Sequence, residues 1–176
     1  MFKKKKGQVW VETVIYTLIA FIMIGAVLAY AKPKVEQLQD KAIIEQSIGI
    51  LKEIDSTILA VISGGTGNIR SVELNLKKGE LQIRGGEEKI VFEMETRYEH
   101  SEPGALIENG NLQELTTKIG RDHSVSLSLN YGGKRDLTFE GGNTPKTLGK
   151  SSTPYTLLIE NKGKTGNLTL IDIGLN

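Results

Sequence analysis

A charge-free apolar run near the start of the chain constrains its fold more than any other feature. The run extends from Thr13 to Ala31, which is 19 residues. About 20 apolar residues in a helix span the roughly 30 Å of hydrocarbon in a bilayer, so the run predicts a membrane helix. A buried helix of a soluble domain is the alternative. The membrane interpretation is favoured by four consecutive lysines shortly before the run: Lys3, Lys4, Lys5 and Lys6.

These four lysines also predict how the helix is oriented. Cytoplasmic flanks of membrane helices carry an excess of Lys and Arg, which places the lysines inside and the chain after Ala31 outside. Lys32 and Lys34 weaken the asymmetry, but the acidic residues Glu36 and Asp40 follow them. We expect a single-pass protein of the cytoplasmic membrane with its N-terminus inside.

Glu12 lies one residue before the uncharged run. A carboxylate that enters hydrocarbon costs on the order of a few kcal/mol unless it has a partner. In one interpretation Glu12 stays among the lipid headgroups and has no role. In the other it pairs with a cation, which cleavage between Gly7 and Gln8 would supply as a new α-amino group. Such a cut would retain the apolar helix, whereas an ordinary secretory signal is removed together with its apolar segment.

The order Lys6-Gly7-Gln8, followed by Val9-Trp10-Val11-Glu12-Thr13, resembles the class III signal peptide of archaeal type IV pilins. In that family a prepilin peptidase cleaves after the glycine, the mature chain begins with glutamine, and its fifth residue is glutamate. Gly7, Gln8 and Glu12 match these positions. Trp10 departs from the pattern, since many members carry a small hydroxyl residue there. Archaellins share the leader type but usually lack this glutamate, so the resemblance favours a pilus.

The resemblance implies a structural subunit that is stored in the membrane and polymerises with copies of itself into an extracellular surface filament. Its implied partners are a prepilin peptidase, an assembly platform protein and an ATPase. Gly25 and Ala29 are small enough to allow close helix packing in the filament, and Glu12 would pair with the Gln8 amine of an adjacent subunit. The filament's role, such as adhesion, motility or uptake, stays open.

Two other functions fit much of the same sequence. One is a minor pilin or pseudopilin of a secretion or uptake machine, which shares these features. The other is an uncleaved, membrane-anchored protein that displays a β-sandwich binding domain. N-terminal sequencing separates the second from both pilin interpretations, because a processed chain begins at Gln8.

Helical spacing resumes after Pro33, which should bend the helix because proline lacks an amide hydrogen. Apolar residues recur every three or four positions from Val35 to Ile62, with charged residues between them, and Gly64-Gly65 predicts the helix end. One helix over 8–62 would extend roughly 80 Å at 1.5 Å per residue. We therefore divide the chain into a leader (1–7), a long helix (8–62, with 13–31 in the membrane or filament core) and a head (63–176).

The head should be rich in β-strands. From Ile69 onward apolar residues alternate with polar ones in about seven or eight short segments, and glycine-containing turns separate them. These turns include Gly85-Gly86 and Lys162-Gly163. The pattern of residues 100–120 is ambiguous and fits either a strand or a helix. The predicted class is α+β, with the long helix packed on an antiparallel β-sheet or β-sandwich.

The sequence offers little chemistry, and we expect neither an enzyme nor a bound metal or cofactor. Asp122-His123-Ser124 lists hydrolase residues, but neighbours on a strand point to opposite faces. His100 and His123 read as surface residues at strand ends. The net charge of +1 indicates no nucleic-acid partner. Asn167-Leu168-Thr169 is an N-glycosylation sequon, which makes Asn167 a candidate glycan site.

Overall fold

The computed structural model describes the backbone of residues 6–176 and the side chains of residues 9–176. The lysines Lys3, Lys4 and Lys5 lie outside the described residues, as do the side chains of Lys6 and Gln8. The chain forms two compact units, one that ends at Gln39 and one from Asp40 to Asn176. A single helix, α1 (Lys6–Ser63), contributes to both units.

Helix α1 continues through Pro33 without a break and ends where the glycine pair predicts. Gly65 adopts φ +84°, a left-handed conformation that glycine takes at little cost. The amide of Gly64 donates to the Ala60 carbonyl and that of Gly65 to the Ile62 carbonyl. These bonds satisfy carbonyls of the last turn, which otherwise lack partners.

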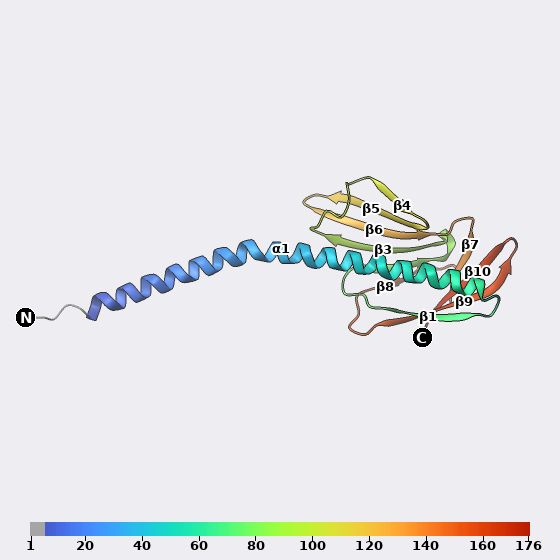
Figure 1. Cartoon of the computed structure of the whole chain (residues 1–176), viewed down its shortest axis with the longest axis horizontal. Helices are drawn as coiled ribbons and strands as arrows, with labels where there is room; N and C mark the ends of the chain where they lie inside the picture. The colour runs from blue at the N-terminus through green and yellow to red at the C-terminus, as the bar shows by residue number, and fades with distance from the viewer. Residues whose placement is uncertain (1–5) are drawn as a thin grey trace, which may run out of the picture. The chain divides into compact units, whose positions relative to one another are not determined.

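The head contains ten strands in two sheets (Figure 1). A four-stranded sheet has the order β1-β9-β10-β7, and a six-stranded sheet has the order β4-β5-β6-β3-β2-β8. Strands β2 and β7 are in contact, which joins the sheets. The strands are β1 (Ile69–Leu74), β2 (Glu80–Arg84), β3 (Lys89–Thr96), β4 (Leu106–Asn109), β5 (Leu112–Ile119), β6 (Asp122–Asn130), β7 (Arg135–Phe139), β8 (Lys146–Leu148), β9 (Tyr155–Thr165) and β10 (Leu168–Leu175).

The predicted α+β class, a long helix packed on antiparallel sheets, is confirmed. One pair departs from it, because β10 runs parallel to β7. After β7 the chain crosses to the other sheet as β8, and it returns as the β9–β10 hairpin with β10 beside β7. The ambiguous segment 100–120 contains two paired strands, β4 and β5.

Lys162-Gly163 was predicted as a turn but lies inside β9, and the hairpin turn follows at Gly166. Leu170 pairs with Gly163 and Ile171 with Asn161, so Lys162 is the extra residue of a β-bulge. Glycine at position 163 accommodates φ +100°. A bulge and a turn both require glycine-like conformations, so composition alone does not distinguish them.

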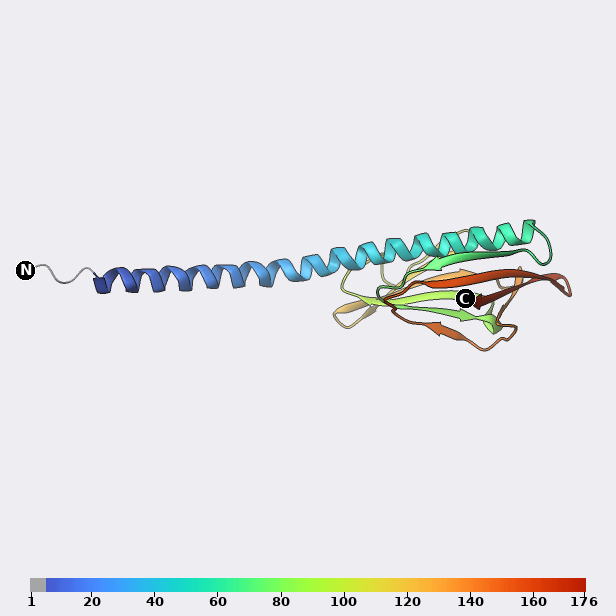
Figure 2. The same cartoon turned by 90° about the horizontal axis from the view of Figure 1, so that it is seen from below.

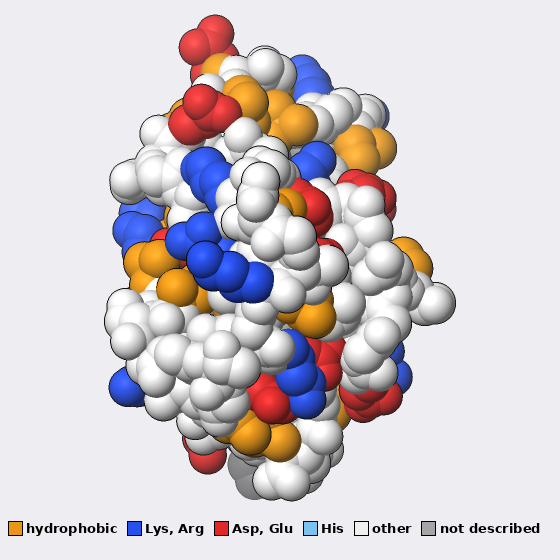
Figure 3. Space-filling model, turned by 90° about the vertical axis from the view of Figure 1, so that its right-hand side faces the viewer, with side chains coloured by type: hydrophobic (Ala, Val, Ile, Leu, Met, Phe, Trp, Pro, Cys, Tyr) orange, Lys and Arg blue, Asp and Glu red, His pale blue; other side chains and the backbone are white. Residues whose placement is uncertain are grey.

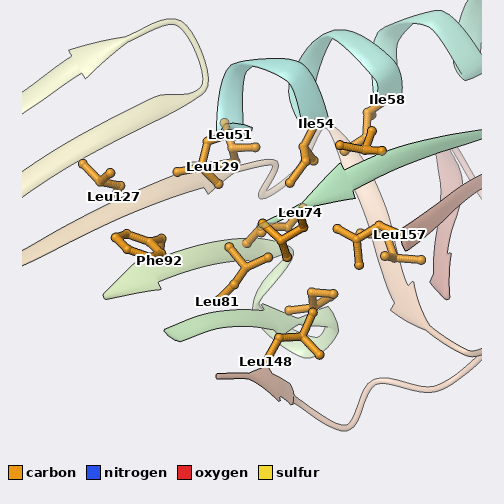
Figure 4. Packing of buried hydrophobic residues seen from close by; sticks show 14 of the residues in the cluster. Leu51, Ile54, Ile58, Leu74, Leu81, Phe92, Leu127, Leu129, Leu148 and Leu157 are labelled. Carbon is orange, nitrogen blue, oxygen red and sulfur yellow. The ribbon is translucent and has the colours of Figure 1, made fainter. Parts of the chain in front are cut away.

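The second part of α1 covers the inner faces of the sheets and completes the core (Figures 2 and 4). Ile44, Leu51, Ile54 and Ile58 are each at most 1% exposed and pack on strand residues that include Leu74, Phe92, Leu127 and Leu157. The predicted apolar stripe began at Val35, but Val35 and Leu38 are 49% and 67% exposed. Burial begins at Asp40. The compact head unit therefore includes the helix from Asp40 onward, whereas the predicted head began at residue 63.

Candidate functional site

The surface of α1 before the head is apolar and uncovered. Every described side chain from Val9 to Tyr30 is exposed, including Trp10 at 71% and Phe21 at 67%. In this segment α1 is long and apolar enough to cross a membrane. Removing apolar surface from water is favourable by about 25 cal/mol for each Å². A large exposed apolar surface is therefore unfavourable in water. The segment is therefore suited to contact with lipid or with other apolar helices.

Two threonine hydroxyls of this segment are satisfied within the helix. The Thr13 hydroxyl donates to the Val9 carbonyl at 2.9 Å, and the Thr17 hydroxyl donates to the Thr13 carbonyl at 2.7 Å. Polar groups in an apolar environment need internal partners because no water is there to replace them. These hydroxyls can enter lipid or a helix bundle without an unsatisfied donor.

The residues predicted for assembly lie on this exposed surface. A Cβ atom added at Gly25 would meet nothing within 4 Å, so the surface at Gly25 is open to a neighbouring helix. Ala29 is one turn further along and exposed. Glu12 is exposed in the second turn of α1. The Gly7–Gln8 bond lies in the first turn of α1.

Asp40 is the first residue of α1 that is buried, at 6% exposure. Its Oδ1 accepts from Lys78 Nζ at 2.5 Å, and its Oδ2 accepts from Thr96 Oγ1 at 2.9 Å and from the Arg97 amide at 3.3 Å. A buried carboxylate is tolerated only when donors replace its lost hydration. Asp40 thereby links α1 to the β1–β2 connection and to the end of β3.

A second carboxylate of α1 makes polar contacts with the head. Asp55 Oδ1 accepts from Tyr131 Oη at 2.7 Å and from Asn111 Nδ2 at 3.0 Å, and Lys134 Nζ donates to Asn111 Oδ1 at 3.0 Å. Burial and the hydrogen bond to Asp55 raise the pKa of Tyr131 above its ordinary value of 10.0. Tyr131 therefore stays protonated and donates to Asp55.

Both histidines are less exposed than the sequence suggested. The His100 side chain is 16% exposed and its Nε2 lies 2.8 Å from Glu114 Oε2; the His123 side chain is 11% exposed and its Nε2 lies 3.6 Å from Glu99 Oε2. His123 is the second residue of β6, at a strand end as predicted, and is partly buried. His100 lies instead in loop 97–105, which lies against β5, where the Gly104 amide donates to the Thr116 carbonyl. Asp122 pairs with Arg97 instead of His123.

The remaining candidates lie on the surface of the head. Asn167 is exposed in the turn between β9 and β10, where a glycan would be unobstructed. A polar crevice of about 240 Å³ lies between the β4–β5 and β6–β7 turns, lined by Asn111 and Lys134 among others. Among residues 9–176, no three His, Asp or Glu side chains lie close enough together to hold a metal ion.

Comparison with protein-family models, curated proteins and solved structures found no match to this chain. Asp40 and Asp55, which bind α1 to the head, are among the charged residues that lie between the apolar positions of the helix in the sequence. In the sequence, each is a carboxylate at the margin of the apolar stripe. Carboxylates on a solvated helix surface look the same, so the sequence does not distinguish them.

Proposed function

We propose that the chain is a structural subunit of an extracellular filament of the type IV pilus kind, stored in the membrane before assembly. The observation that carries the proposal is the uncovered apolar surface of α1 from Val9 to Tyr30. Before assembly this surface contacts lipid. In the filament it contacts the same segment of neighbouring subunits, so lipid contacts are exchanged for helix–helix packing.

In this proposal a prepilin peptidase cleaves between Gly7 and Gln8, and the new amine pairs with Glu12 of an adjacent subunit. An ion pair in an apolar core is tolerated when each charge has a partner, whereas an unpaired carboxylate there is strongly unfavourable. Glu12 thereby sets the axial position of one helix relative to the next. An assembly platform and an ATPase drive extraction from the membrane.

The test begins with filaments sheared from cells that produce the chain. Electron microscopy should show filaments, and their subunit should begin at Gln8 by N-terminal sequencing. A subunit that retains the lysines, or that stays monomeric in the membrane, contradicts the proposal. Abundance in the sheared fraction then separates a major subunit from a minor pilin.

Glu12→Ala tests the assembly role. Processing should continue, while the amount of sheared filament falls to background because the α-amine loses its partner. Glu53→Ala is the matched control, since Glu53 is an exposed glutamate of the same helix within the head unit. Normal filament yield from Glu12→Ala would contradict the role given to this carboxylate.

A membrane-anchored binding protein is the second candidate. The apolar segment of α1 is long enough to serve as a membrane anchor that stays intact. In that case the exported protein retains its lysines, and the polar crevice beside Asn111 is its candidate binding region.

A further inference from the structure

Two of the outermost strands of the head, β4 and β1, differ in charge. Strand β4 is outermost at one end of the six-stranded sheet, with β8 at the other end, and β1 is outermost at one end of the four-stranded sheet, with β7 at the other. Because β2 and β7 join the sheets, β4 and β1 lie at opposite sides of the head (Figure 1). Edge strands carry unpaired backbone N–H and C=O groups that can pair with another chain.

The acidic edge consists of Glu102, Leu106, Ile107 and Glu108. All four residues of β4 are exposed, and Leu106 and Ile107 are 54% and 45% exposed. From Tyr98 to Asn111 the chain has three glutamates and no lysine or arginine. Within the described residues, Glu102 and Glu108 form no ion pair, although Glu108 accepts a hydrogen bond from Gln113 at 2.7 Å.

The basic edge is the N-terminal end of β1, with Ile69 and Arg70, together with Lys164 in the adjoining β9–β10 hairpin; the exposed Glu73 lies near the other end of β1. Ile69 is 55% exposed. The hairpin lies against the loop before β1, since a Cβ at Gly163 would approach Thr66 Cγ2 to 3.3 Å. Lys162 pairs with Glu160 at 2.7 Å, whereas Arg70 and Lys164 form no ion pair within the described residues. Figure 3 faces this end of the head, where Lys and Arg side chains gather.

We propose that the acidic edge of one copy binds the basic edge of a second copy of this chain. Each edge offers exposed aliphatic side chains, free backbone groups and two charges without an ion-pair partner, and the charges are opposite in sign. Pairing of two acidic edges would place Glu108 near another Glu108, which is unfavourable. The charges therefore select unlike edges and disfavour a symmetric dimer.

A contact between unlike edges leaves one acidic and one basic edge free after each addition. Such head-to-tail contacts form rings or open helical assemblies. The inference rests on the proposed function, and it adds a second contact between subunits, made by their heads. In this arrangement the apolar helices hold the filament together, and the edges fix the rotation of each head relative to the next.

Charge reversal in the full-length chain on cells tests the proposal. Glu102→Lys with Glu108→Lys should lower the yield of sheared filament about fivefold at low salt, and so should Arg70→Glu with Lys164→Glu. The quadruple variant restores opposite charges and should recover the yield. Lys77→Glu with Lys150→Glu is the matched control. Both lysines are exposed, and neither belongs to the acidic or the basic edge.

Wild-type yield from both double variants, or no recovery in the quadruple variant, would overturn the edge contact while leaving the filament proposal intact. Absence of filaments from the unaltered chain would instead refute the proposed function and, with it, this inference.

Cross-linking gives a second measurement, since the chain has no cysteine. In filaments with Ile69→Cys and Ile107→Cys together, a short bis-maleimide should produce a ladder of multimers, while each single variant should remain monomeric. Dimers from Ile107→Cys alone would indicate like-edge pairing and contradict the inference. So would cross-links to a different protein in place of the ladder.

Discussion

The two parts of α1 form one continuous helix, but apolar side chains are exposed in the first part and buried in the second. From Val9 to Tyr30 apolar side chains are exposed on all sides, whereas from Asp40 to Val61 the apolar residues form a stripe that the sheets bury. A helix that is apolar all round needs an apolar environment, and an amphipathic one needs a partner on one face. The head supplies the partner of the second part, and the first part is long and apolar enough to cross a membrane.

The comparison also separates folding from assembly. The second part of α1 belongs to the same compact unit as the strands, so its substitutions should change the stability of the head. The first part contributes nothing to that core, so its substitutions should leave the head intact; in the proposed filament they should change assembly.

The largest expected effect comes from the buried stripe. Ile54→Ala removes a side chain with 0% exposure and should lower the free energy of unfolding of the head by roughly 2–5 kcal/mol. Ile22→Ala, at a position 63% exposed, should change it by less than about 0.5 kcal/mol. Denaturant unfolding of the full chain in mild detergent measures both values. Equal losses of unfolding free energy in the two variants would contradict the view that only the second part of α1 belongs to the core.

Asp40→Asn tests the position where burial begins. The substitution removes the charge that accepts from Lys78 and Thr96, and it should cost about 1–3 kcal/mol. Amide hydrogen exchange should accelerate first around Asp40 and at the end of β3. If exchange accelerates only before Pro33, Asp40 does not stabilise the attachment of the helix to the head.

Tyr131→Phe tests how the second part of α1 is held to the head, because the stability lost in this variant should depend on pH. Loss of the hydrogen bond to Asp55 should cost about 1 kcal/mol at pH 7. Because the pKa of Tyr131 is raised in the folded chain, its contribution is fully present below the unfolded pKa of about 10 and is lost as pH rises above that value. The stability difference between the two proteins should therefore shrink in unfolding titrations above pH 10. A constant difference would contradict the raised pKa.

Asn167→Gln should have the smallest effect on the fold, because the residue is exposed in a turn. Stability should change by less than about 0.5 kcal/mol. If the sequon is occupied, intact mass of the exported chain should exceed the polypeptide mass, and the substitution should remove the excess. An unchanged mass would show that Asn167 is unmodified.

Local patterns predicted most of the elements but few of their partners. The glycine pair after Ser63 marked the end of α1, and alternation located β1, β2, β3, β6, β7, β9 and β10. Periodicity reports which side of an element is apolar, and it contains no information on which strand lies next to which. The parallel pairing of β10 with β7 and the bulge at Lys162 therefore appeared only in the fold.

The candidate sites divide in the same way. The apolar run, Glu12 and the Gly7-Gln8 pair lie close together in the chain, so the sequence alone identified the segment that is long and apolar enough to cross a membrane. Its physical basis is length and hydropathy, which do not depend on tertiary contacts. The hydrogen-bond partners of Asp40 and Asp55, the partial burial of both histidines and the opposite charges of the two sheet edges depend on residues far apart in the chain. Only folding decides these, because burial and proximity depend on how the strands pair and pack.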